Sequence, residues 1–198
     1  MKLYFTRHGE SEANRLRIIS DRDLPHPLTE TGRQQAAELA EKLRGKPLTC
    51  IYASPILRAR QSGDILSAAL NVPLVLEDAL REPDCGLLEG RGDAEAWAEH
   101  KLWFEAWLAG RDLDIGPQGG ETCNIVRQRF AQFIEKLMEK YGESPAEFVL
   151  VTHGEAMLFG LPGLVENLDA HYLLEHGIGH AGLLTVSCES GKMILQEK

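Results

Sequence analysis

The sequence has little of what marks a secreted, membrane-spanning or metal-binding chain. Its four cysteines are scattered and show no C-x-x-C spacing. We therefore expect thiols that pack as small apolar side chains, with no disulfide framework and no metal site. No apolar run approaches the length that crosses a bilayer, and the opening residues 1–5 are too short for a signal peptide. These absences predict a cytoplasmic protein.

Positive charge is also scarce. The 198 residues include 21 lysines and arginines against 30 aspartates and glutamates, for a formal net charge of −9. This balance disfavours nucleic acid and anionic membranes as partners. Because the chain is acidic overall, a local cluster of arginines is more informative than it would be in a basic protein.

Strand and helix signals alternate along the chain, as in α/β proteins. We expect strands at 3–6, 49–53, 72–76, 147–152, 182–188 and 192–196, and helices at 11–16, 29–44 (with Thr29 or Thr31 as the cap), 56–70, 93–109, 121–141 and from about 155. The pattern predicts a three-layer sandwich with a mostly parallel central sheet and helices on both faces. Residues 1–198 form one domain in this interpretation, and residues 91–118 form a helical insertion over one edge of the sheet.

Basic residues follow the ends of several predicted strands. Arg7 and His8 come directly after the first strand, and His153 comes after the run 148–152. Arg58 follows the Ser54-Pro55 stop of the second strand. Open α/β sheets bind ligands at the edge where such strand ends meet, and the planar guanidinium of arginine pairs with two phosphate oxygens at once. The spacing therefore predicts a phosphoryl-binding site.

Several ordered motifs carry a family resemblance. They are Arg7-His8-Gly9-Glu10-Ser11 with Asn14, then Leu28 to Ala36, Ser54 to Gln61, Leu80-Arg81-Glu82 with Gly86 and Glu89-Gly90, Gly119-Gly120-Glu121-Thr122, and Val151-Thr152-His153-Gly154. In this order they resemble the histidine phosphatase (phosphoglycerate mutase-like) superfamily, whose first motif is the RHG sequence. The resemblance covers residue 3 to about residue 154.

The resemblance implies a mechanism that suits these residue types. His8 would attack phosphorus and form a phosphohistidine, with its other ring nitrogen donating to a backbone carbonyl. Arg7, Arg58 and His153 would stabilise the charge on the equatorial oxygens. Glu82 would be the general acid, with a pKa raised by burial and by the nearby phosphate. The remaining phosphate contacts would come from Asn14 and Gly154, and no metal or cofactor would be needed.

Several of these residues also have a plainer interpretation. Arg7 and His8 could be a strand-end pair satisfied by local carboxylates, although the ordered partner motifs argue against it. His153 taken alone would be a core histidine bonded to backbone, and only its pairing with His8 reverses that. Arg58 could lie on a solvated helix face near Asp64, and Glu82 could be one of several solvated loop carboxylates. The other histidines have no convincing spacing and are expected at the surface or the rim of the pocket; they are His26, His100, His171, His176 and His180.

The choice between hydrolysis and phosphoryl transfer depends on the insertion. Residues 91–118 hold three basic and six acidic residues, a net charge of −3, which makes a poor second phosphate site. We therefore expect a phosphoric monoester hydrolase of the histidine acid type that acts on a small phosphorylated metabolite. The alternatives are a cofactor-dependent phosphoglycerate mutase and, less favoured, a phosphohistidine protein phosphatase or a regulatory binder of phosphorylated ligands. A monomer and a homodimer are both compatible with the sequence.

Specificity is expected to depend on the insertion and on the loop at 15–26. The pocket candidates in that loop are Ser20, Asp21, Arg22 and His26. Two departures from the family pattern bear on substrate choice rather than catalysis. Ser62-Gly63 stands where threonine and alanine are more usual, and an apolar run from Ala156 to Phe159 stands where many members place an arginine.

Overall fold

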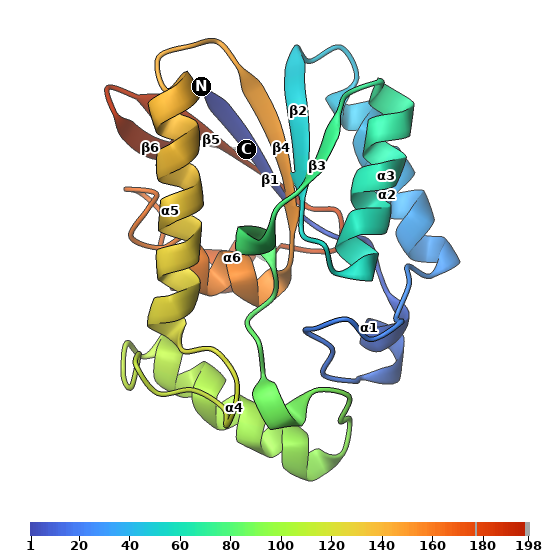
Figure 1. The fold of residues 1–198 in the computed structure, drawn as a ribbon, viewed down its shortest axis with the longest axis vertical. Coiled ribbons are helices and arrows are strands. Elements are labelled where there is room, and N and C mark those ends of the chain that lie inside the picture. The colour runs from blue at the N-terminus through green and yellow to red at the C-terminus, as the bar shows by residue number, and fades with distance from the viewer. Residues whose placement is uncertain (177, 197–198) are drawn as a thin grey trace.

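The fold is described by a computed structural model for residues 1–176 and 178–196 (Figure 1). The sheet has six strands in the order β3-β2-β4-β1-β5-β6. The strands are β1 (Lys2–Arg7), β2 (Leu48–Ala53), β3 (Leu74–Leu76), β4 (Glu147–Thr152), β5 (Leu183–Glu189) and β6 (Lys192–Leu195). The helices are α1 (Glu12–Leu16), α2 (Glu30–Leu43), α3 (Leu57–Leu70), α4 (Ala94–Leu108), α5 (Cys123–Tyr141), α6 (Gly154–Gly160) and α7 (Ala170–His176).

The sheet is mostly parallel, as the alternation of elements predicts. Strands β1 to β4 pair in parallel, and β5 pairs antiparallel with both β1 and β6. In the centre, the register between β1 and β4 sets Arg7 opposite Thr152. The next residue of each strand is a histidine, so His8 and His153 leave the sheet side by side.

Hydrophobic cores on both faces of the sheet explain the three layers. Along β4, Phe148 and Leu150 pack into the core beneath α5 and α6, while Val149 and Val151 pack against α2 and α3. Alternate side chains of a strand point to opposite faces, and a run that is apolar at every position is buried on both faces. Figure 1 shows α5 and the α2–α3 pair on opposite sides of the sheet.

The expected insertion is α4, which lies beyond the carboxyl ends of the central strands (Figure 1). Asp93 caps its first turn by accepting a hydrogen bond from the Ala96 N–H. The Trp97 indole donates to the Arg17 carbonyl at 2.9 Å, and the Phe104 and Trp107 rings meet the Phe159 ring edge-on at 5.5 and 5.3 Å. The aromatic stripe of this helix therefore packs mainly against the rest of the molecule, as its spacing indicates.

Some element boundaries differ from the sequence predictions. The helix Ala170–His176 was not predicted, because its seven residues are too few for a clear amphipathic pattern. The segment 77–92 between β3 and α4, for which no strand or helix was predicted, contains two 3₁₀ turns, Asp78–Leu80 and Gly86–Leu88. The third strand covers Leu74–Leu76 rather than 72–76, since Pro73 has no N–H for a sheet ladder. Within the described ranges, no helix is both long and apolar enough to cross a membrane.

Candidate active site

His8 is held as a neutral imidazole with one tautomer favoured. Its Nδ1 lies 2.6 Å from the Gly9 carbonyl oxygen, and its Nε2 accepts a hydrogen bond from the Arg58 Nε at 3.0 Å. The proton is therefore on Nδ1 and the lone pair is on Nε2. Burial, and then the charges of Arg58 and Arg7, hold the pKa of His8 well below its usual value. A neutral histidine with a fixed lone pair can act as a nucleophile.

His153 lies against His8 at the end of β4. The two ring centroids are 5.0 Å apart, and the His153 Nε2 is 2.8 Å from the Ser54 hydroxyl. Burial and the charge of Arg58 lower the pKa of His153 as well. When the Ser54 hydroxyl donates to Nε2, the proton of this neutral ring lies on Nδ1, where it can donate to a ligand.

Three nitrogen atoms around His8 are buried without a hydrogen-bond partner in the part of the chain that the structure describes. They are Nε of Arg7, Nη1 of Arg58 and Nδ1 of His153. A buried donor left unpaired costs about 1–3 kcal/mol, so such groups mark a place where a ligand supplies acceptors. A phosphoryl group, with oxygens on several sides, suits this arrangement. Arg58 is only 4% exposed, which rules out the solvated helix face.

Close backbone packing fixes the position of the Arg7-His8-Gly9 (RHG) motif. A Cβ on Gly9 would collide with the Gly32 carbonyl, and a Cβ on Gly32 would collide with the backbone of Glu10. The Gly9 N–H donates to the Ser62 hydroxyl at 3.2 Å, and this hydroxyl donates in turn to the Arg58 carbonyl at 2.9 Å. Ser62 therefore joins the segments that carry His8 and Arg58.

Gly63, which departs from the family pattern together with Ser62, is explained by packing. A Cβ there would lie 2.9 Å from a methyl carbon of Leu74 and 3.0 Å from the Cβ of Ala53. The glycine lets α3 pack closely on β2 and β3, and this offsets the helix-propensity cost of about 0.5–1 kcal/mol.

Glu82 reaches the site from the loop after β3. Its carboxylate accepts hydrogen bonds from the Ala156 N–H at 2.9 Å and the Glu155 N–H at 3.4 Å, at the start of α6. Burial, and then the charge of Glu155, raise the pKa of Glu82. A carboxyl group that holds its proton at higher pH is suited to protonate a leaving group.

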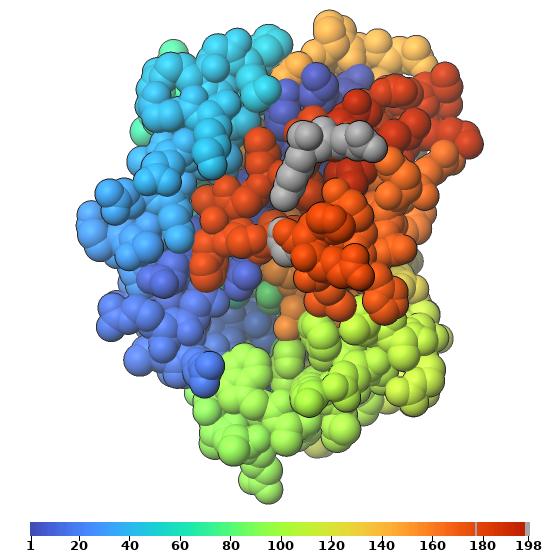
Figure 2. All heavy atoms as spheres, turned by 180° about the vertical axis from the view of Figure 1, so that it is seen from behind, coloured from blue at the N-terminus to red at the C-terminus, as the bar shows by residue number. Residues whose placement is uncertain are grey.

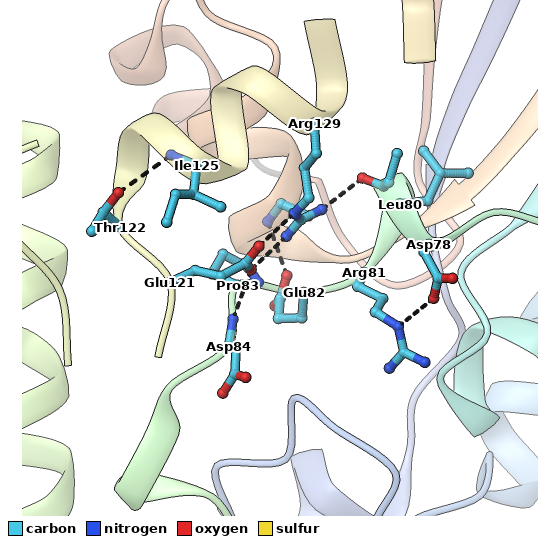
Figure 3. Close-up of polar contacts among 12 residues, drawn as sticks. Asp78, Leu80, Arg81, Glu82, Pro83, Asp84, Glu121, Thr122, Ile125 and Arg129 are labelled. Carbon is cyan, nitrogen blue, oxygen red and sulfur yellow. Dashed lines mark hydrogen bonds and ion pairs between the residues drawn. The ribbon is translucent and has the colours of Figure 1, made fainter. Parts of the chain in front are cut away.

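An ion pair between Arg129 of α5 and Glu121, which precedes this helix, anchors the loop that carries Glu82 (Figure 3). Arg129 binds Glu121 through two hydrogen bonds of 3.0 Å and donates a third, of 2.6 Å, to the Ala79 carbonyl. Glu121 accepts from the Asp84 N–H at 3.1 Å. The loop is thus attached to one pair on both sides of Glu82.

The pocket candidates of the 15–26 loop take different places. Asp21 is buried, and burial together with the Glu82 charge raises its pKa to about 8. The Arg22 guanidinium is paired with Asp84: its Nε donates to both carboxylate oxygens of Asp84 at 2.9 Å. Arg22, Asp21 and Glu82 line one cavity. Ser20 and His26 bond each other at 2.9 Å, so these two side chains support the loop instead of lining the site.

Asn14 lies beside the site, but its carbonyl oxygen is used within the protein. It accepts from the Ser11 N–H at 3.0 Å and from the Ser11 hydroxyl at 2.8 Å, which closes a capping box on α1. The same oxygen lies 3.1 Å from the His180 Nε2. A contact from Asn14 to phosphate stays a prediction.

Sequence reasoning missed two contributors. The His180 ring is 5.9 Å from the His8 ring, and burial and the Arg7 charge lower its pKa to about 4. Glu155 pairs with His100 at 3.2 Å, which ties α6 to α4. Neither pair has a sequence spacing that could reveal it, because the partners are 172 and 55 positions apart. No group of three or more His, Cys, Asp or Glu side chains that could hold a metal ion occurs among the residues described.

The fold and the site together define an α/β protein in which the ends of β1 and β4 and the first turn of α3 bring together two neutral histidines and two arginines. The chain belongs to the histidine phosphatase superfamily (branch 1), whose family model matches residues 3–197. The resemblance seen in the motifs is therefore confirmed and extends through the last two strands.

Individual relatives carry both mutase and phosphatase names. The chain is 33% identical over 172 residues to a protein named "Probable phosphoglycerate mutase GpmB" from Photorhabdus laumondii, covering 86% of this chain and 77% of the relative. It is 29% identical over 194 residues to "Fructose-2,6-bisphosphatase TIGAR B" from Danio rerio, covering 93% and 72%.

Solved structures match over almost the full chain. Bacillus stearothermophilus YhfR has a TM-score of 0.83 at 25% identity, with 100% of this chain and 96% of that chain covered. A mycobacterial glucosyl-3-phosphoglycerate phosphatase has a TM-score of 0.81 at 25% identity, covering 98% and 96%.

Proposed function

We propose that the protein hydrolyses phosphate monoesters through a phosphohistidine on His8, without a metal ion. The observation that carries this proposal is the lone pair on the His8 Nε2, surrounded by unpartnered donors of Arg7, Arg58 and His153. In-line attack would form the N–P bond and break the P–O bond to the leaving group. The three donors would stabilise the charge on the equatorial oxygens.

Glu82 would supply the proton to the leaving oxygen and then take a proton from the attacking water. In this sense the activity is that of a histidine acid-type phosphatase, with a histidine nucleophile and a carboxylic acid as proton donor. Its raised pKa supports the first role. The substrate would be a small phosphorylated metabolite.

Hydrolysis is favoured over a mutase reaction by the charges of the cap. Two of the three basic residues in 91–118 are already paired: Arg91 with Asp93 at 2.7 Å, and Lys101 with Glu105 at 3.6 Å. Such a cap offers little to a second phosphate group. The four free cysteines support the further prediction of a reducing, cytoplasmic setting.

The test compares two reactions of the same purified protein. Phosphate release from p-nitrophenyl phosphate is measured beside the conversion of phosphoglycerate in the presence of its bisphosphate primer. We expect phosphate release that depends on His8 and slow isomerisation. Fast isomerisation with negligible release would show a mutase instead.

A further inference from the structure

A cavity of about 450 Å³ opens beside the proposed phosphate position. It lies between α4, α6 and the region of α7, where Figure 2 shows a hollow above the yellow-green α4. Arg7 and Glu82 form part of its wall, and the other lining residues are Phe104, Gly154, Glu155, Leu158, Leu173, Leu174, Ile178 and Gly179.

The presence of both Arg7 and Glu82 makes this cavity the place for the leaving group. Another cavity, of about 470 Å³, is also lined by Glu82, but Arg7 does not line it. A general acid must lie within hydrogen-bond reach of the oxygen that it protonates. The leaving oxygen therefore has to be on the Glu82 side of the phosphoryl group, and the rest of the alcohol continues into the adjoining space. Arg7 lines the same cavity and marks the boundary with the phosphate position.

The cavity offers no free cation to a second negative charge. Among its described lining residues Arg7 is the one cation, and its unpartnered Nε is part of the phosphate position. The two other ionisable residues are the acids Glu82, which holds its proton as the general acid, and Glu155. His100 pairs with the Glu155 carboxylate at 3.2 Å, so this positive partner is already engaged. A carboxylate or phosphate on the leaving group would meet acids with no free cation.

The remaining wall is apolar. Leu158 and Leu173 are largely buried, whereas Leu174 is 44% exposed at the rim. Phe104 is held edge-on against Phe159. An apolar group in this space would cover exposed hydrophobic surface, which is favourable in proportion to the area removed from water.

A second cavity offers the opposite chemistry. It lies on the other side of Arg7, has a volume of about 550 Å³, and is lined by Arg17, Trp97 and His180 among others. Arg17 could meet an anionic group there. Glu82 does not line this second cavity, so a leaving group placed in it would be far from the proton donor.

We propose that this enzyme selects phosphate monoesters of uncharged, apolar alcohols or phenols, and that the cavity bounded by Glu155 and Leu174 makes the selection. The inference rests on the proposed function and names its substrate class. It accounts for the apolar run after His153-Gly154, where the family resemblance leads one to expect an arginine.

A matched pair of esters tests the proposal. Phenyl phosphate and 4-carboxyphenyl phosphate differ by one carboxylate, and the second has the better leaving group. We nevertheless expect kcat/KM to be about tenfold lower for the carboxylated ester, because its charge enters an acidic, apolar cavity. Leu174→Lys, which places an ammonium at the rim, should narrow this ratio about threefold or more. Leu87→Lys is the control, because Leu87 is 67% exposed and does not line the cavity.

The outcomes distinguish a failure of the proposed selectivity from a failure of the proposed function. Equal kcat/KM values for the two esters in the unmodified protein would overturn the proposed selectivity. So would a ratio that Leu174→Lys leaves unchanged while Arg17→Ala alters it, because the leaving group would then occupy the second cavity. Failure of both esters to release phosphate in a His8-dependent manner would overturn the proposed function, and this proposal with it. Thermal unfolding of each variant checks that the fold is retained.

Discussion

Two walls of one small site have opposite chemistry. On the sheet side, His8, Arg58 and His153 are all at most 4% exposed. His8 presents a lone pair on Nε2, and Arg58 and His153 have unpartnered donor nitrogens. The other side, called the loop side, presents the carboxyl groups of Glu82 and Asp21, which lie on loops, and of Glu155, at the start of α6. Burial acts on both walls, yet it lowers the pKa of His8 and His153 and raises the pKa of Glu82 and Asp21.

This difference shows how one low-dielectric site serves two tasks. Burial disfavours whichever form of a group is charged, so it keeps the two histidines neutral and holds the protons of Glu82 and Asp21 to higher pH. The permanent positive charge comes from arginine, which stays protonated even when buried. The sheet side therefore suits attack and charge stabilisation, and the loop side suits proton delivery.

Among the residues of the two walls, removal of the nucleophile on the sheet side should have the largest effect on turnover. His8→Ala should reduce kcat at least about 10⁴-fold, because no other side chain can form the covalent intermediate. Phosphate release and trapping of acid-labile phosphate on the protein provide the measurement. Phosphate binding, followed by titration calorimetry, should be partly retained. His171→Ala, at an exposed histidine, is the control. Retained turnover in His8→Ala would exclude His8 as the nucleophile.

Loss of the buried Arg58 guanidinium should have the second-largest effect on turnover. Arg58→Ala should lower kcat about 10²–10³-fold, because a preorganised donor to the transition state is lost. The matched control is Arg60→Ala, two residues along the same helix and exposed, which should leave kcat unchanged. Steady-state kinetics with p-nitrophenyl phosphate checks both. Equal losses for the two arginines would mean that burial of Arg58 serves only the fold.

Loss of the Glu82 carboxyl group on the loop side should have an effect that depends on the leaving group of the substrate. Glu82→Gln should lower kcat/KM about 10²-fold for an alkyl phosphate and less than about tenfold for p-nitrophenyl phosphate, whose leaving group needs little protonation. Activity toward the alkyl ester should fall as pH rises through the raised pKa of Glu82, because the acid must be protonated. That alkaline decline should be absent in the variant. Equal losses with both esters would exclude Glu82 as the acid.

Loss of the Arg129–Glu121 ion pair, which anchors the loop that carries Glu82, should lower activity in the same leaving-group-dependent way but by less. Arg129→Met removes the hydrogen bond to Ala79 and frees Glu121. We expect about a tenfold loss of kcat/KM for alkyl esters, a smaller loss for aryl esters and little change in KM, as when a catalytic group is displaced. Gln128→Met, at the exposed neighbouring position, is the control. Uniform losses across esters would indicate a purely structural role.

The smallest expected effect is on stability. Asp21 keeps its proton up to about pH 8 in the folded protein but releases it near its ordinary value of 3.8 when unfolded. The folded state therefore binds more protons between these values, and the free energy of unfolding falls as pH rises. Asp21→Asn should remove this fall, which is at most about 1.4 kcal/mol per pH unit.

Urea unfolding between pH 5 and 8 measures that slope. Asp23→Asn is the control, because the Asp23 side chain is 82% exposed. Stability curves of the unmodified protein and Asp21→Asn that run parallel across this range would show that Asp21 is ionised in the folded state.

Much of the fold could be predicted because its signals are local. The runs at β1 and β4 are apolar at consecutive positions, and a strand buried on both faces requires that pattern. The two His-Gly pairs follow those runs directly, so the parallel register that brings His8 to His153 needed only that the two strands be neighbours. The short helix α7 escaped prediction because its seven residues carry too little periodicity.

The sequence by itself determined the strand ends, the order of the motifs and the residue types that can hold a phosphoryl group. Only the tertiary structure decided which nitrogen of His8 carries the proton, that Asp21 is buried beside Glu82, and that Glu155 and His180 belong to the site. The physical reason is that burial and charge proximity depend on segments far apart in the chain, and these set protonation states that no local pattern encodes.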